Sequence, residues 1–165
     1  MLTAADMALH YASLTQGRRA LQRAGALLAR ADAAALALRL APDMFDAGGQ
    51  LRTVAGFALR AVLPLTGRPV PDLPADLALR LAAARAALAP LTPDDFAGAA
   101  ARRLRHRAGF ADLDQSAADY LHLFALPNLW FHLAMAYAAM RAGGLPLGKA
   151  DFDGLHEYPQ GFRWE

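Results

Sequence analysis

The chain has 165 residues, a formal net charge of +2 at pH 7 and no cysteine. A chain of this length forms one domain and buries roughly 70% of its unfolded surface in a single core. Without cysteine the sequence excludes disulfides, a thiolate nucleophile and cysteine-ligated zinc. So small a net charge gives no indication of a nucleic-acid partner.

Hydrophobic residues make up 56% of the chain, and many of them are alanine. Arginine and aspartate interrupt the apolar runs, and none approaches the roughly 20 residues needed to span a bilayer. The opening MLTAADMALHYA lacks the basic region and the continuous apolar stretch of a signal peptide. We therefore expect a cytoplasmic bacterial protein with no membrane partner.

The first predicted helix opens on Thr3 and Asp6, spaced as in a capping box. Heptad spacing then predicts an inward stripe made of Met7, Tyr11, Leu14, Leu21 and Leu28. Arg18 falls on this stripe. We expect its stem to pack against the core and its guanidinium to reach solvent.

A second helix is predicted to begin with Pro42 and Asp43 in its first turn, where a fixed φ and a negative charge are favoured. Its predicted inner face consists of Met44, Leu51, Ala55, Ala58 and Val62. It should end near residues 64–67. The proline-rich segment 67–74 is predicted to be a non-helical connection across the end of a bundle.

A third helix is predicted over residues 75–89, with Leu77, Leu81, Ala84 and Leu88 facing inward. The run Thr92-Pro93-Asp94-Asp95 signals a further short helix. Residues 98–114 have no helical period, and their alternation suits a short two-stranded excursion. The basic run 102–107 lies here and has no interleaved aromatics, so we interpret it as a solvated hairpin or loop.

The fourth helix is predicted over residues 116–141, with a kink at Pro127 because proline cannot donate a backbone hydrogen bond. Gly143 and Gly144 should end it. The bundle thus spans about residues 3–144 of a single domain, and residues 145–165 form a tail. The tail's aromatics are expected to pack on the body or on a second subunit; they are Phe152, Tyr158, Phe162 and Trp164.

Four pieces of the sequence resemble one bacterial family. They are LAPDMF with a following Gln (40–50), GRPVP (67–71), YL…FALPN…FH…AY (120–137) and LPLGKADF (145–152). This pattern is similar to the domain of unknown function nineteen-ninety-three family, in the DinB/YfiT-like superfamily. The resemblance implies an all-α DinB-like four-helix bundle in up-down-down-up order, with the long connection between the second and third helices. The residue pattern adds the short hairpin or irregular insertion before the last helix. The resemblance also implies frequent dimerisation.

Better-known members of that superfamily bind a divalent metal through three histidines, and some are small-thiol-dependent transferases or isomerases. In this sequence Gln50, Asn128 and His132 occupy the three positions. One imidazole and two neutral amides make a poor zinc site. His122 and His132 lie about 15 Å apart along one helix, too far to share an ion. We therefore expect no metal and no cofactor.

Two interpretations of Gln50, Asn128 and His132 remain open. They form either a buried hydrogen-bond network that also serves the carbonyl freed by Pro127, or a site for a small polar molecule between the second and fourth helices. No catalytic machinery is evident. The alternative is a metal-dependent small-thiol transferase or isomerase with His132 as a ligand. The alanine- and glycine-rich faces of the first two helices, the low net charge and the tail aromatics further predict a two-fold symmetric homodimer, with the region after Leu145 contributing to the contact or bracing it.

Overall fold

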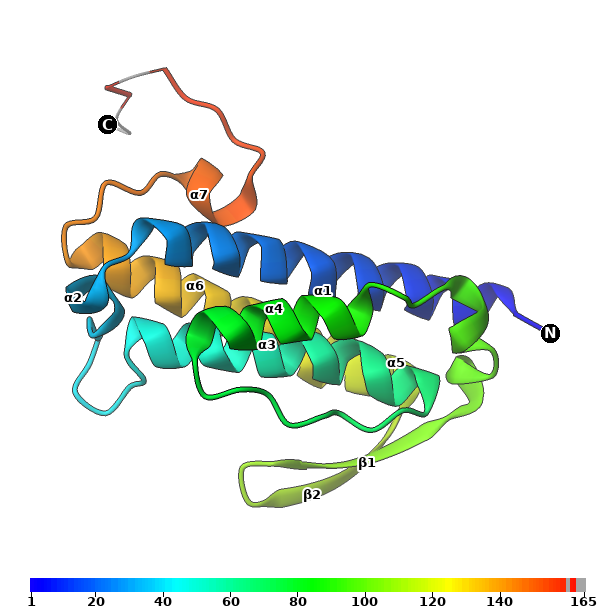
Figure 1. Cartoon of the computed structure of the whole chain (residues 1–165). Coiled ribbons are helices and arrows are strands. Elements are labelled where there is room, and N and C mark those ends of the chain that lie inside the picture. Colours follow the sequence, from blue (N-terminus) through cyan, green and yellow to red (C-terminus); the bar gives the residue numbers. More distant parts are fainter. Residues whose placement is uncertain (160, 163–165) are drawn as a thin grey trace.

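A computed structural model describes residues 1–159 and 161–162 of the chain. Four long helical segments pack side by side, and a two-stranded sheet starts near one end of the bundle and runs back beside it (Figure 1). The long segments are α1 (Ala4–Arg30), α3 (Ala47–Val62), α4 (Leu77–Leu88) and α6 (Leu126–Ala142). The fold is therefore mostly helical with a hairpin before the last helix, as the sequence predicts.

Helix α1 begins with the predicted capping box. The Asp6 carboxylate accepts hydrogen bonds from the Thr3 backbone N–H at 2.9 Å and the Thr3 hydroxyl at 2.7 Å. The predicted inward stripe is wrong at Met7 and Tyr11, which are exposed. The buried face is rotated toward small residues and consists of Asp6, Leu9, Ser13, Leu14, Gly17, Ala20, Leu21, Ala24 and Leu27. Alanine and glycine let neighbouring helices come close there, which heptad spacing of large side chains does not reveal.

Helix α3 starts later than predicted. Pro42 and Asp43 lie in a turn after the short helix α2 (Ala33–Leu36), and Asp46 is the N-cap that accepts from the Gly49 N–H at 2.7 Å. A cap side chain needs an extended backbone just before the helix, and Asp46 provides it. The predicted inner face is buried from Leu51 onward, whereas Met44 precedes the helix.

The connection from α3 to α4 follows the prediction. It comprises η1 (Leu63–Thr66), a left-handed turn at Gly67 and an extended proline-rich segment that runs back along the bundle (Figure 1). Asp76 caps α4, and all four predicted inward residues of that helix are buried. After α4 come η2 (Pro93–Phe96), which begins at the predicted Thr92 cap, and η3 (Ala99–Ala101).

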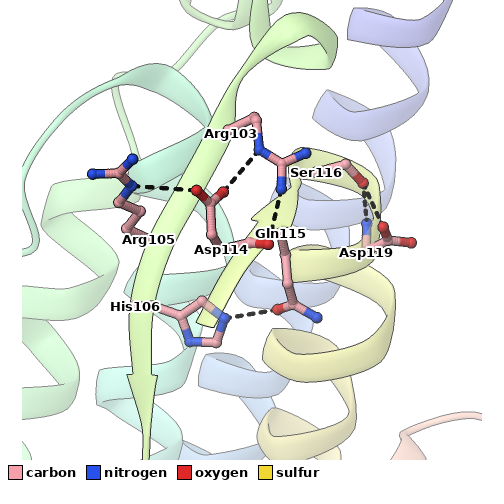
Figure 2. Close-up of polar contacts among 7 residues, drawn as sticks. All are labelled: Arg103, Arg105, His106, Asp114, Gln115, Ser116 and Asp119. Atoms are coloured by element: carbon pink, nitrogen blue, oxygen red, sulfur yellow. Dashed lines mark hydrogen bonds and ion pairs between the residues drawn. The ribbon is translucent and has the colours of Figure 1, made fainter. Parts of the chain in front are cut away.

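The basic run 102–107 supplies most of strand β1 (Arg103–Ala108), which pairs antiparallel with β2 (Ala111–Ser116) in a hairpin. Figure 2 shows Arg103 and Arg105 donating to one carboxylate, Asp114, at 2.8 and 3.2 Å. These hydrogen bonds hold the pKa of Asp114 below its usual range. On the inner side, His106 contacts Gln115 at 2.7 Å. The cationic side chains are therefore solvated and partly neutralised by neighbouring acids.

The last long helical segment contains a π-helical turn. It consists of α5 (Ala117–Asp119), η4 (Tyr120–Ala125) and α6, and the Leu126 N–H donates to the carbonyl of Leu121, five residues back. A π turn accommodates Pro127 by widening the helix before it, where the sequence predicts a simple kink. Gly143 and Gly144 end α6 as predicted.

The described part of the tail packs on its own chain. Phe152, in α7 (Lys149–Asp153), contacts Trp130 and Tyr137 with ring centroids 5.9 and 5.8 Å apart. The Arg19 guanidinium donates to the carbonyl of Asp153 at 2.6 Å. The prediction for Phe152 is thus confirmed in its first form, packing on the body. Trp164 lies outside the described residues.

One core runs through the bundle, with α1 and α3 each packed against the other and against both α4 and α6. The segment Ala117–Ala142 is long and apolar enough to cross a membrane by length and composition alone. The prediction that no apolar run approaches that length is wrong here, because the charged residues Asp119 and Arg141 stand near its ends. The core helix of a bundle meets the same criterion, and this segment packs against α1 and α3.

Candidate functional site

Gln50 and His132 meet across the α3–α6 contact. Gln50 lies one turn into α3 and is buried, and His132 lies in the second turn of α6 and is half-buried. The imidazole Nδ1 and the amide Oε1 are 2.6 Å apart. Two of the three residues that the sequence singles out are therefore brought together from positions 82 residues apart.

The orientation of the Gln50 amide sets the proton on His132. The amide Nε2 donates to the carbonyl of Phe45 at 3.4 Å, so Oε1 faces the imidazole as an acceptor. Nδ1 of His132 must then carry the hydrogen, and the neutral ring keeps an unprotonated lone pair on Nε2. No hydrogen bond to Nε2 occurs among the described residues. The pair thus presents one oriented hydrogen-bond acceptor.

Aromatic rings surround this acceptor. The His132 ring stacks with Phe45 and with Phe57, at centroid distances of 6.4 and 5.6 Å, and makes a T-shaped contact with Phe131 at 5.2 Å. Burial among them lowers the pKa of His132, because a charged ring loses hydration there. Phe45 and Phe131 are 59% and 50% exposed. The imidazole is therefore held neutral at the edge of an open aromatic surface.

Asn128 takes a different role from the one the network interpretation gives it. Its amide nitrogen donates to the carbonyl of Phe124 at 2.7 Å, one turn back on the same helical segment. That carbonyl lies at the π turn, where the regular ladder of backbone bonds changes. Asn128 therefore supports the helix beside Pro127, and no hydrogen bond joins it to Gln50 or His132 in the described part of the chain.

The donor set does not fit the metal that the family resemblance implies. Nδ1 of His132 is already bonded to Gln50, and the Asn128 amide nitrogen is bonded to a backbone carbonyl. Divalent transition metals prefer imidazole, thiolate or carboxylate ligands over neutral amides. Within the described residues, no group of three histidine, aspartate or glutamate side chains could hold an ion.

Sequence reasoning missed the aromatic neighbours of His132. Phe45 sits within the LAPDMF piece and Phe57 two turns after Gln50, but the sequence pattern by itself singles out neither residue. Seven residues separate Gln50 and Phe57, which places them on one helix face, and this spacing could have indicated their common environment.

None of the three predicted site residues lines the cavities of about 710, 430, 310 and 210 Å³ in the described fold.

Comparisons with known proteins identify the family. No curated protein matches the chain. The structure is similar to a crystal structure of a DinB family member from Shewanella denitrificans, with a TM-score of 0.75 and 27% identity over 93% of this chain and 96% of that one. The family model described as "Domain of unknown function (DUF1993)" matches residues 4–153. The chain therefore belongs to the DUF1993 family and has a DinB-like fold.

Proposed function

We propose that this protein binds a small polar molecule at the α3–α6 edge, with Nε2 of His132 as the acceptor for a donor group of the ligand. The supporting observation is the chain of contacts from the Phe45 carbonyl through Gln50 to His132, which leaves a neutral, oriented acceptor. The exposed rings of Phe45 and Phe131 offer stacking surface to a flat ligand. The preferred ligand therefore combines a planar apolar part with an N–H or O–H donor.

Binding without catalysis is favoured over the metal-dependent transferase or isomerase. That reaction needs two further metal ligands, and Gln50 and Asn128 supply neutral amides that are engaged elsewhere. A lone neutral imidazole can still accept a proton from a bound molecule. The proposal gives His132 a recognition role and assigns no reaction to it.

A thermal-shift screen with a library of planar N–H-bearing metabolites tests this function. We expect at least one compound to raise the Tm of the wild type and to lose that effect in His132→Ala and Phe45→Ala. His122→Ala is the matched control, since His122 is an exposed histidine on the same helical segment. A shift that survives in His132→Ala contradicts the proposed site.

We also propose the up-down-down-up order for α1, α3, α4 and α6, and a cytoplasmic location. The order is supported by the connection of residues 63–76, which returns along the bundle between α3 and α4 (Figure 1). A connection of that length lets two consecutive helices run parallel, whereas short loops join antiparallel neighbours. The location is supported by a cysteine-free composition.

A further inference from the structure

A second feature lies at the opposite edge of the bundle, where α1 packs against α4. A groove of about 710 Å³ runs between these helices. Three arginines line it, namely Arg18 and Arg19 from α1 and Arg85 from α4, together with the polar side chains of Thr15 and Gln22. A groove of this size accommodates a metabolite-sized molecule.

Arg85 is fixed against α1 by a backbone contact. Its Nη2 donates to the carbonyl of Leu21 at 2.8 Å. The guanidinium occupies the space above Gly25, where an added Cβ would lie 2.1 Å from Nη2. A glycine at this position therefore makes room for the arginine head on the helix surface.

Arg18 is fixed from the other side of the groove. Its Nη2 donates to the carbonyls of Leu88 and Ala89, at 2.8 and 3.1 Å, at the C-terminal end of α4. Arg18 is exposed, as the sequence predicts, and these hydrogen bonds to the end of α4 add a contact that the sequence does not indicate. The negative end of the helix dipole holds the cation there.

The three guanidiniums carry charge that the groove leaves unbalanced. The lining contains no aspartate or glutamate. None of Arg18, Arg19 and Arg85 forms an ion pair within the described residues, whereas the hairpin arginines are paired with Asp112 and Asp114. Each groove arginine bonds a carbonyl through Nη2, so Nε and Nη1 keep their donors for another acceptor.

We propose that the α1–α4 groove binds a phosphorylated small molecule. Three cations without a counter-charge favour a multiply charged anion. Guanidinium donors lie on both walls of the groove, and the oxygens of a phosphate point in several directions, so one phosphate can accept from both walls. Hydrogen bonds to backbone carbonyls fix all three guanidiniums before binding, so less side-chain entropy is lost. The volume exceeds that of one phosphate, which leaves room for the organic part beside Thr15 and Gln22.

Calorimetric titration of the full chain with inorganic pyrophosphate, at constant ionic strength, tests the proposal. We expect saturable one-to-one binding that weakens at least tenfold in Arg85→Gln and Arg19→Gln. Arg85 is exposed and forms no ion pair within the described residues, so we expect its replacement to leave the fold intact. Arg85→Lys keeps the positive charge but loses the planar set of guanidinium donors. Its affinity for pyrophosphate should therefore lie between those of the wild type and Arg85→Gln.

Arg107→Gln is the matched control, because it removes the same charge from the exposed hairpin. Its affinity should stay within twofold of the wild type. An equal loss in Arg107→Gln means general electrostatic attraction and overturns the proposal, as does the absence of saturable binding by the wild type. Sedimentation with phosphatidylglycerol vesicles, without pyrophosphate binding, would identify a membrane surface instead and also overturns it. None of these results bears on the α3–α6 site.

Discussion

At the scale of single residues, one backbone carbonyl decides the chemistry of His132. The Phe45 carbonyl orients the Gln50 amide, and the amide in turn fixes the hydrogen on Nδ1. A buried amide pays a free-energy penalty for each unmade hydrogen bond, so both contacts of Gln50 resist rotation of the amide. His132 is thereby committed to one tautomer before any ligand arrives.

Replacing Gln50 with glutamate should raise the pKa of His132 above its wild-type value. A carboxylate in place of the amide oxygen, 2.6 Å from Nδ1, favours the charged ring and opposes the effect of burial. An NMR titration of the histidine ring protons measures this. An unaltered His132 curve contradicts the contact.

Burial of His132 also predicts a pH dependence of stability. Its pKa is lowered in the folded chain from an ordinary value of 6.5, so the unfolded chain binds more protons there. The free energy of unfolding should therefore fall as the pH drops below 6.5, and should recover above it. Urea unfolding across this range should show a smaller change in His132→Gln than in the wild type.

Asn128→Ala separates helix support from ligand binding. Loss of the hydrogen bond to the Phe124 carbonyl should lower the free energy of unfolding by about 1 kcal/mol. The His132 titration should stay the same, because the two side chains do not bond each other in the described residues. A shifted His132 pKa in this variant would favour the three-residue network instead.

The sequence contains the candidate residues but only part of their arrangement. The one-turn spacing of Asn128 and His132 is visible, and the family resemblance adds Gln50. Which of them bond each other depends on side-chain rotamers and on the position of Phe45, since Phe45 precedes the Asp46 cap of α3. Such contacts arise only after packing, and periodicity does not encode them.

At the scale of helices, Asp6 joins two elements. Beyond capping α1, its carboxylate accepts from the Ala100 N–H of η3 at 2.8 Å. The hydrogen bond from the Ala100 N–H has the largest effect on the pKa of Asp6, and that from the Thr3 N–H comes next. Together they hold this pKa well below its usual range. The capping box was predictable from spacing, whereas the second bond, across 94 residues, was not.

Asp6→Asn should therefore lower the Tm at neutral pH and flatten its acid dependence. A carboxylate with a lowered pKa stabilises the fold at pH values above the ordinary 3.8 and loses that effect as the pH falls further. Differential scanning calorimetry between pH 2 and 7 measures both changes. Asp112→Asn, at an exposed hairpin position, serves as the control and should leave the Tm unchanged.

The helices themselves were mostly predictable, and their errors have physical causes. The position and inner face of α4 are predicted correctly, because its buried leucines recur at helical spacing between two proline-rich boundaries. The start of α3 was placed too early, since Pro42 and Asp43 suit a turn as well as a first helical turn. The inner face of α1 depends on alanine and glycine, whose burial follows from neighbouring helices.

At the scale of the whole molecule, the α1 glycines Gly17 and Gly25 have partners within the chain. A Cβ on Gly17 would lie 3.3 Å from the carbonyl of Ala58, and Gly25 is covered by Arg85. These residues therefore allow close packing inside the bundle. Exposed apolar side chains elsewhere, such as Leu123 and Phe131, are the observation that supports self-association.

We propose a two-fold symmetric homodimer, to which the region after Leu145 contributes. Exposed apolar residues of this region, including Leu155 and Phe162, extend beyond the completed bundle. Light scattering at micromolar concentration should give twice the chain mass for the full-length protein. A version ending at Gly154 should dimerise more weakly. A monomeric full-length chain contradicts the dimer, and equal dimerisation of both forms assigns the tail no part in it.

The π turn at η4 has a consequence for chain length. Its backbone bonds span five residues where an α-helix spans four, so the turn holds one residue more than a regular helix needs. Deleting one residue between Leu121 and Phe124 would replace the π turn with α-helical turns that bend at Pro127, while the residues from Leu129 onward keep their face toward the core. Relatives that are shorter by one residue at this place would share the same fold. An alignment gap there would mark an α-helical turn in place of the π turn.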